Sequence, residues 1–282
     1  MVTWFVTGAS RGFGLEIARQ ALERGDRVVA TARSPKAVEE ALPEHGERLL
    51  AVELDVTNEA QAKAAVEAAV KRFGKIDVVV NNAGRGLLGA VEEASDAAVR
   101  AVYDTNVFGV LNVTRAVLPV LRAQGSGHII NMSSVGGFTG SAGWGIYCST
   151  KFAVEGFSEA MQLELESLGV NVTIVEPGYF RTDFLDVSSL STEQLVIDDY
   201  AKSSGAMRDL VPGINHAQPG DPVKAVAAIL QIADAPKPPR RIQFGSDCVA
   251  DLAKKIADLE EEAATWRELS LSTDHDDVKS GS

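Results

Sequence analysis

Tyr147 and Lys151 stand four positions apart in the stretch YCSTK. On an α-helix this spacing places both side chains on one face, so a phenol and an ammonium group can meet at one point. A free phenol has a pKa of about 10, and a neighbouring cation lowers that pKa by favouring the phenolate. Such a pair could exchange a proton with a substrate oxygen near neutral pH. Two solvated side chains would show the same spacing, so the surrounding chain must decide.

Two adjacent serines, Ser133 and Ser134, end the apolar run that begins at residue 127, and Ser134 stands thirteen positions before Tyr147. Either hydroxyl could donate a hydrogen bond to a substrate oxygen that gains negative charge. Adjacent residues on a strand point to opposite faces, so we expect only one of the two to face the site.

A glycine-rich turn, TGASRGFG at residues 7–14, follows the first apolar run and precedes a helical pattern. Backbone N–H groups in such a turn can approach a pyrophosphate at the positive end of the helix. Gly8 would permit the tight turn, Gly12 the close approach and Gly14 the close packing of helix on strand. The spacing is GxxxGxG, and it predicts a dinucleotide site. A plain strand-to-helix turn is the alternative interpretation.

Two arginines lie where this dinucleotide would place its adenosine ribose. The second apolar run should end near Ala32, where an NAD enzyme carries an acid, but the sequence there reads TARSP. Arg33 follows the run, and Arg11 lies in the glycine turn. Guanidinium groups suit a 2′-phosphate, so we expect NADP(H) rather than NAD(H). The alternative is that both are solvated surface arginines.

Strand-like and helical patterns alternate along the chain and predict the fold. The strand-like runs are continuously apolar and cover residues 2–7, 27–32, 48–54, 76–81, 127–133, 171–177 and 240–245. Continuous apolar runs are typical of a parallel sheet buried on both faces. We therefore predict an α/β fold, a doubly wound parallel sheet of the Rossmann type, with ligands at the carboxyl ends of its strands.

No linker or repeat divides the chain, so residues 1–272 are expected to form a single domain. Residues 183–220 show no clear strand and are interpreted as an irregular, mobile substrate-loop insertion. An extended C-terminal helix is predicted over residues 246–269. A polar tail, expected to be frayed, covers residues 273–282.

The bulk composition excludes several classes of protein. The 282 residues have a net charge of −12, which argues against a nucleic-acid partner. No signal peptide or apolar run long enough for a membrane span is seen, and the only two cysteines predict a reducing cytoplasm. Metal-ligand spacing is lacking among the four scattered histidines, so no metal is expected; these are His45, His128, His216 and His275.

Seven short strings in order along residues 2–182 resemble the classical short-chain dehydrogenase/reductase family. They are TGASRGFG, LDVT with Asp55, NNAG at 81–84, TNVFG at 105–109, NMSS at 131–134, YCSTK, and EPGYFRT at 176–182. The resemblance implies a single-domain Rossmann fold with a seven-stranded parallel sheet. It also implies hydride transfer between a nicotinamide cofactor and a carbonyl or alcohol.

The resemblance assigns most of the cofactor contacts. Asp55 and Val56 would contact adenine, the turn at 82–84 would border the cofactor, and Thr182 would bond the nicotinamide carboxamide. A turn-former after a strand is the alternative for Asp55, and a structural loop is the alternative for the turn. The full set expected to bind the cofactor is Gly8, Ser10, Arg11, Gly12, Phe13, Gly14, Arg33, Asp55, Val56, Asn82, Ala83, Gly84, Tyr147, Lys151, Pro177, Gly178 and Thr182.

The resemblance also completes a catalytic tetrad. Tyr147 would be the general acid in reduction, and Lys151 would support it and bind the nicotinamide ribose. The interval of thirteen residues is usual in the family and favours Ser134 over Ser133 as the second donor. Asn106 lies in a long helical pattern and would hold a water that passes protons to Lys151; a local bend of the helix is its other interpretation.

Apolar residues near the expected carbonyl site predict a hydrophobic pocket. They are Leu87, Phe138, Trp144, Tyr179 and Phe184. Such a pocket suits a small hydrophobic ketone or aldehyde, or the matching alcohol. The alternative is that several of them only pack in the core.

The C-terminus departs from the commonest family pattern. Leu252, Ile256, Leu259, Ala263 and Trp266 recur at spacings of four and three, which gives one apolar stripe. We expect this helix to dock on its own domain, with a partner contact as the alternative. The ending resembles the hydroxysteroid and retinol dehydrogenase branch and puts the usual tetramer in doubt. A homodimer through the helices that begin near Ser95 and Tyr147 is therefore expected, with a tetramer as the alternative.

Two other functions fit parts of the pattern. A non-catalytic NADP(H)-sensing regulator would keep the fold, although such proteins usually lack the tyrosine or the lysine. A sugar-nucleotide-type epimerase or dehydratase also uses Tyr and Lys, but with another glycine spacing and a larger C-terminal domain. The sequence favours NADPH-dependent reduction of a carbonyl.

Overall fold

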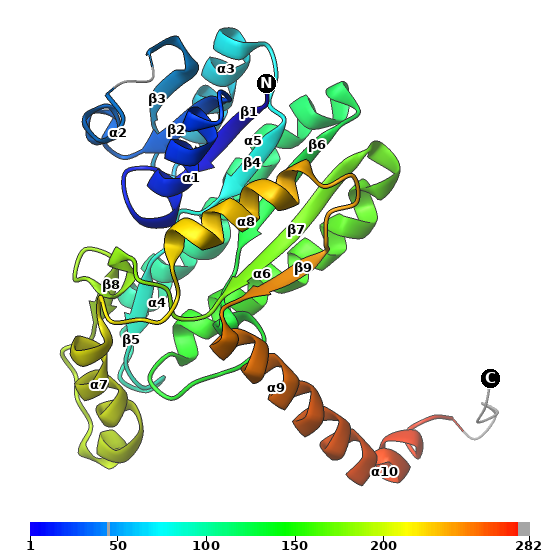
Figure 1. Ribbon diagram of the computed structural model, residues 1–282. Helices are drawn as coiled ribbons and strands as arrows, with labels where there is room; N and C mark the ends of the chain where they lie inside the picture. The colour runs from blue at the N-terminus through cyan, green and yellow to red at the C-terminus, as the bar shows by residue number, and fades with distance from the viewer. Residues whose placement is uncertain (44–45, 276–282) are drawn as a thin grey trace.

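The computed structural model describes residues 1–43 and 46–275. Seven parallel strands form one sheet in the order β3-β2-β1-β4-β6-β7-β9 (Figure 1). The strands are β1 (Thr3–Thr7), β2 (Arg27–Ala32), β3 (Leu49–Glu53), β4 (Val78–Asn81), β6 (Gly127–Met132), β7 (Val170–Pro177) and β9 (Arg241–Phe244). The predicted doubly wound parallel sheet is confirmed.

Helices cover both faces of the sheet. Those that take part are α1 (Gly12–Glu23), α2 (Pro35–Ala41), α3 (Glu59–Phe73), α5 (Gly109–Gln124), α6 (Gly145–Leu165) and α8 (Pro222–Asp234). The helices α1, α2 and α8 pack on one face, and α3, α5 and α6 pack on the other. Alternate residues of one strand enter different cores, because Trp4 and Val6 face α1 while Phe5 faces α3. Burial on both faces explains why the strands are apolar without alternation.

The order of the strands positions a ligand site. The strand β1 pairs with β2 on one side and with β4 on the other, so the chain reverses its direction of winding between β1 and β4. Open α/β sheets bind ligands at such a switch point, beyond the carboxyl ends of the strands. The glycine-rich turn follows β1 and the NNAG turn follows β4, so both lie at this crevice.

The segment 183–220 is more ordered than the sequence predicted, and the expectation of no strand is wrong. The strand β8 (Leu190–Thr192) pairs in parallel with β5 (Gly86–Leu88), which follows the NNAG turn. A helix, α7 (Ala206–Ile214), then lies beside this small sheet (Figure 1). The strand was missed because three residues give no readable period, and their partner is distant in sequence.

The C-terminal helix does not dock on its own domain, so that expectation is also wrong. The helix α9 (Ser246–Thr265) contacts β9 and the turn after β6 at its base and then leads away from the sheet, followed by α10 (Arg267–Leu271) (Figure 1). Cys248 is its one buried residue. Thr273–His275 of the polar tail are exposed, and residues 276–282 lie outside the described part of the chain, as does His45. Among the described residues, no helix is both long and apolar enough to cross a membrane.

Candidate active site

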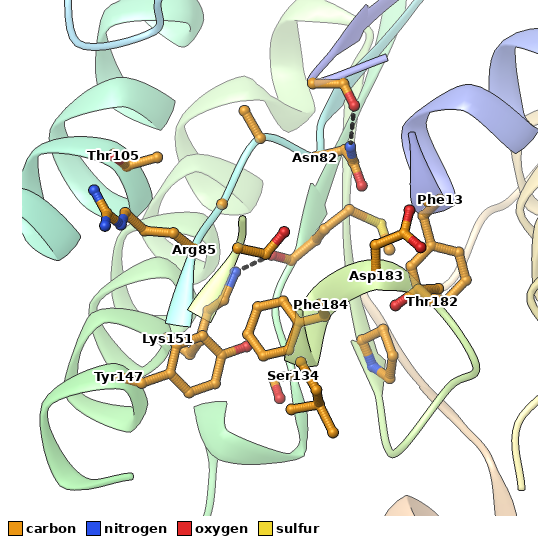
Figure 2. Close-up of a pocket in the computed structure, with 18 of the residues that line it drawn as sticks. Phe13, Asn82, Arg85, Thr105, Ser134, Tyr147, Lys151, Thr182, Asp183 and Phe184 are labelled. Atoms are coloured by element: carbon orange, nitrogen blue, oxygen red, sulfur yellow. Dashed lines mark hydrogen bonds between the residues drawn. The ribbon is translucent and has the colours of Figure 1, made fainter. Parts of the chain in front are cut away.

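A cavity of about 600 Å³ opens at the carboxyl ends of the strands (Figure 2). It brings together residues from distant parts of the sequence, and most of the residues predicted for the site line it. Those are Gly8, Ser10, Arg11, Gly12, Phe13, Arg33, Asp55, Val56, Asn82, Ala83, Gly84, Ser134, Trp144, Tyr147, Lys151, Pro177, Gly178, Tyr179, Thr182 and Phe184. Gly14 and Asn106 lie behind its wall, and Leu87 and Phe138 do not line it.

The glycine-rich turn has the geometry that a pyrophosphate requires. Gly8 and Gly12 have φ values of +66° and +54°, a region that residues with a Cβ rarely adopt. A Cβ at Gly14 would collide with the carbonyl oxygen of Gly8, so a glycine is needed for the turn to close on the helix. No side chain caps the N-terminus of α1 within the described residues, and its first turn holds no acid. Its open N–H groups therefore fit an anion.

Two arginines line the cavity at the turns that follow β1 and β2. Arg33 is exposed just after β2, and Arg11 belongs to the glycine turn. The Arg11 guanidinium donates to the backbone oxygen of Ser188 at 2.9 Å, which ties the turn to the segment 183–220. Asp55 Oδ1 accepts hydrogen bonds from the Thr57 N–H and hydroxyl at 3.0 and 2.7 Å. Both its turn-forming role and its place in the cavity are therefore seen.

The NNAG turn is fixed to β1 by side chains. The Thr7 hydroxyl oxygen accepts from the N–H groups of Asn82 and Ala83, at 2.9 and 3.0 Å. The Asn82 amide donates in turn to the Thr7 backbone oxygen at 2.9 Å and to the Gly8 backbone oxygen at 3.2 Å (Figure 2). This turn is a structural tie across the switch point and a wall of the cavity at once.

Tyr147 and Lys151 lie on the face of α6 that borders the cavity (Figure 2). The Lys151 ammonium donates to the backbone oxygen of Met132 at 2.8 Å and lies 5.9 Å from the centre of the Tyr147 ring. Burial lowers the pKa of Lys151 to about 8, and the carboxylate of Glu155 opposes that shift. Both groups converge as the i, i+4 spacing predicted.

The expected lowering of the tyrosine pKa is not found in the protein alone. Burial raises the pKa of Tyr147 above that of a free phenol, and a hydrogen bond with Ser134 acts in the opposite direction. Desolvation penalises the phenolate more than its neighbours favour it. Tyr147 is therefore a proton donor in this state, and its use as a base requires additional positive charge.

The two serines point to different partners. Ser134 lies beside Tyr147, and its oxygen accepts the N–H of Gly136 at 3.1 Å. Ser133 instead lies near the buried carboxyl of Glu155, and both side chains border Gly137. Both serines nevertheless line the cavity, so the expectation that only one would face it is wrong. They follow the end of β6 at Met132, where the alternation of a strand no longer applies.

Asn106 lies in one turn of π-helix, Asp104–Phe108, that interrupts the long helical pattern between α4 (Asp96–Tyr103) and α5. Its amide donates to the Arg85 backbone oxygen at 2.9 Å and to the Thr150 hydroxyl at 3.0 Å. Its oxygen accepts the Arg85 N–H at 2.9 Å. The side chain is 1% exposed, so it joins the segment after the NNAG turn to α6 rather than facing the cavity.

An aromatic cluster surrounds the phenol. The ring of Phe184 lies 5.3 Å from Tyr147 and 6.5 Å from Trp144, and Trp144 lies 5.8 Å from Tyr147. Leu185, Leu190 and Val211 from the segment 183–220 pack on the same cluster with Leu88. The immediate surroundings of the phenol are therefore aromatic and aliphatic, and Leu88 takes the place expected for Leu87, because alternate residues of β5 face opposite sides.

Sequence reasoning missed several lining residues. Arg85, Asp104, Thr105, Asp183 and Gln218 line the cavity. Arg85 could have been found, since it directly follows the NNAG string; the others depend on pairings that no local pattern reveals. Asp183, Asp186 and His216 also place ligand-type atoms within 4.8 Å of one another. Asp186 is already hydrogen-bonded to Asn215 and His216, at 2.7 and 3.1 Å.

Comparison with known proteins agrees with this geometry. A family model described as short chain dehydrogenase matches residues 3–192. Oxidoreductase BOA17 of Botryotinia fuckeliana is 40% identical, over 96% of this chain and 98% of that protein. A 3-ketodihydrosphingosine reductase of Bacteroides thetaiotaomicron is 39% identical, over 85% of this chain and 86% of that protein. Retinol dehydrogenase 16 of Rattus norvegicus is 37% identical, over 71% of this chain and 63% of that protein.

Solved structures give the same result. A short-chain dehydrogenase from Streptomyces avermitilis superposes with a TM-score of 0.90 at 38% identity, over 97% of this chain and all of that chain. A serine dehydrogenase complexed with NADP+ has a TM-score of 0.74 at 29% identity, over 86% and 94%. A short-chain dehydrogenase/reductase from Burkholderia phymatum in complex with NAD has a TM-score of 0.79 at 26% identity, over 99% and 98%.

Proposed function

The chain belongs to the short-chain dehydrogenase/reductase family, and from this premise we propose that it reduces a hydrophobic ketone or aldehyde reversibly with NADPH. One observation carries the proposal. The buried phenol of Tyr147 and the open N-terminus of α1 line the same cavity. A dinucleotide that spans the two would supply a hydride to a carbonyl carbon beside the phenol.

The chain's own residues would handle the proton and the developing charge. Tyr147 donates its proton to the carbonyl oxygen, since its raised pKa keeps the phenol protonated. Ser134 donates a hydrogen bond to the same oxygen as negative charge grows on it. Lys151, cationic below a pH of about 8, stabilises the phenolate that remains after the phenol has given up its proton, and it binds the ribose. Asn106 acts as a positioning residue, because it fixes Arg85 and Thr150 around this group.

NADPH is proposed over NADH on the charge at the adenosine end. Arg33 follows β2 where an acid would grip a ribose hydroxyl, and Arg11 adds a second guanidinium. Both can form charge-assisted hydrogen bonds to a 2′-phosphate. A similar serine dehydrogenase binds NADP+, whereas another similar protein binds NAD. The choice of NADPH is therefore supported by the two arginines and not by the similar proteins.

A bulky apolar substrate is proposed because aromatic and aliphatic side chains enclose the phenol. Trp144 and Phe184 flank Tyr147, and α7 adds Val211. Relatives named for a 3-keto sphingoid base and for retinol act on long apolar molecules, which supports the same class. Two buried, unpaired cysteines are consistent with a cytoplasmic protein, and we expect a homodimer.

The proposal is tested by following nicotinamide absorbance with NADPH or NADH and a panel of carbonyls. The panel pairs bulky apolar ketones and aldehydes with small polar ones. We expect turnover with the bulky members and a preference for NADPH. Tight NADPH binding without turnover of any carbonyl or alcohol would contradict the proposal and favour the cofactor-sensing alternative.

A further inference from the structure

The helix α9 leaves the domain with an apolar face open to solvent (Figure 1). It has 20 residues and is therefore about 30 Å long. Val249, Ile256 and Leu259 are 55%, 49% and 50% exposed, and Trp266 at its end is 57% exposed. Apolar side chains that recur along one face of a projecting helix indicate a contact surface.

The spacing of this face is that of a coiled coil. Val249, Leu252, Ile256, Leu259 and Ala263 follow one another at intervals of three, four, three and four residues. These intervals place Val249, Ile256 and Ala263 at the first position of a heptad, and Leu252 and Leu259 at the fourth. An alternation of three and four keeps one seam facing a partner helix.

We propose that a second copy of this chain covers this seam, with the two α9 helices parallel and in register. The residue types support this occupant. In a parallel coiled coil, Val and Ile at the first heptad position with Leu at the fourth favour two strands. Because a twofold axis would run along the seam, each residue would meet its own copy, and no other partner is required.

Charges beside the seam fit the same arrangement. Lys255 stands directly before Ile256, which is at a first heptad position, and Glu260 stands directly after Leu259, which is at a fourth heptad position. The two charged residues are five positions apart. In a parallel pair, these two positions approach each other across the seam, so Lys255 of each chain would meet Glu260 of its copy. Lys254, on the outer face, is already paired with Asp258 at 2.5 Å. The outer face is therefore charged and the seam is flanked by opposite charges.

Disulfide trapping in the full-length protein tests the pairing directly. In Leu259→Cys, oxidation should yield a covalent dimer, because a parallel in-register pair brings the two cysteines together. Glu261→Cys, on the outer face of the same helix, is the matched control and should yield little. The two native cysteines are buried and unpaired, which limits background. Equal cross-linking of both variants, or of neither, would overturn the proposal. So would a disulfide that forms only when Ile256→Cys chains are mixed with Leu259→Cys chains, because that result would indicate an antiparallel pair.

A charge swap provides a second, independent measurement. Lys255→Glu should lower the mass of the assembly twofold at dilute concentration in sedimentation, because like charges would then flank the seam. Lys255→Glu/Glu260→Lys should restore the original mass. Turnover of a carbonyl should be retained in every variant, so a failure here is distinct from a failure of the proposed reaction. An unchanged mass in Lys255→Glu, or no restoration by the double variant, would contradict the coiled coil.

Discussion

Arg208 of α7 donates hydrogen bonds to both carboxylate oxygens of Glu93, at 2.7 and 3.0 Å, and Glu93 is only 1% exposed. The backbone N–H groups of Ala90 and Ile197 donate to the same carboxylate at 2.7 and 2.9 Å. One buried group thus joins the loop after β5 to two parts of the segment 183–220. This pair holds the apolar wall of the pocket against the domain.

Replacement of Arg208 by Met should destabilise the protein by about 3–5 kcal/mol, because a buried carboxylate would lose its counter-charge. The free energy of unfolding from urea titration measures this. The double variant Glu93→Gln/Arg208→Met should lose less than the sum of the single variants, since no charge is then buried alone. Additive losses would contradict the account.

The same pair predicts sensitivity to acid. Hydrogen bonds from Arg208, and then from the Ile197 N–H, lower the pKa of Glu93 from 4.5 to about 2. The stabilisation from a lowered carboxyl pKa is complete above about pH 4.5 and is lost as the pH falls towards 2. In the double variant this part of the acid dependence should be absent.

Asn106→Ala should cost about 2–4 kcal/mol of stability, because the N–H and C=O of Arg85 and the Thr150 hydroxyl would lose their partner. Chemical denaturation again provides the measurement. Asn112→Ala is a control on the following helix. Asn112 makes two hydrogen bonds rather than three, to the Val56 oxygen and from the half-exposed Arg115 guanidinium, so its loss should cost less. Equal costs would show that the Asn106 contacts add little.

The pH dependence of carbonyl reduction should report the deprotonation of Lys151. Burial lowers its pKa to about 8, so the ammonium is cationic below that pH and loses its charge above it. We expect kcat/KM for ketone reduction to be level below about pH 8 and to fall at higher pH. In Lys151→Arg the fall should move to higher pH, because a guanidinium stays charged.

Glu155 is the matched control for this profile. Its negative charge raises the pKa of Lys151 against the effect of burial. Glu155→Gln should therefore move the alkaline fall to lower pH. If the pH at which kcat/KM falls is the same in both variants as in the parent protein, a group other than Lys151 limits the rate.

Arg33→Asp should shift the ratio of kcat/KM for NADPH over NADH towards NADH by about 10–100-fold. That range corresponds to the loss of about 1.5–3 kcal/mol from charged hydrogen bonds to a 2′-phosphate. Lys63→Asp on α3, outside the cavity, makes the same change in net charge and should leave the ratio unchanged. An unaltered ratio in Arg33→Asp would show that the phosphate is bound elsewhere.

The fold and the geometry of the glycine-rich turn were predictable because they depend on local patterns. Continuous apolar runs predicted the parallel strands, and three glycines at fixed spacing predicted a turn in which Gly14 has no room for a Cβ. Tyr147 and Lys151 converge because one helix carries both. Each of these inferences required only neighbours in sequence.

The substrate end was less predictable because it depends on distant pairings. The strand β8 exists only through β5, about a hundred residues earlier, and the Glu93–Arg208 pair joins segments equally far apart. The raised pKa of Tyr147 follows from burial by Phe184 and Trp144, which no spacing reveals. The direction of α9 was mispredicted because an apolar stripe does not identify the surface that covers it.

The central claim is that the Tyr147 phenol supplies the proton in carbonyl reduction, and Tyr147→Phe tests it most directly. The phenyl ring keeps the packing with Trp144 and Phe184, so NADPH affinity should remain close to that of the parent protein. Turnover of a bulky ketone should fall by about 10²–10⁴-fold, the usual contribution of a general acid. Turnover comparable to the parent, with NADPH still bound, would contradict the account.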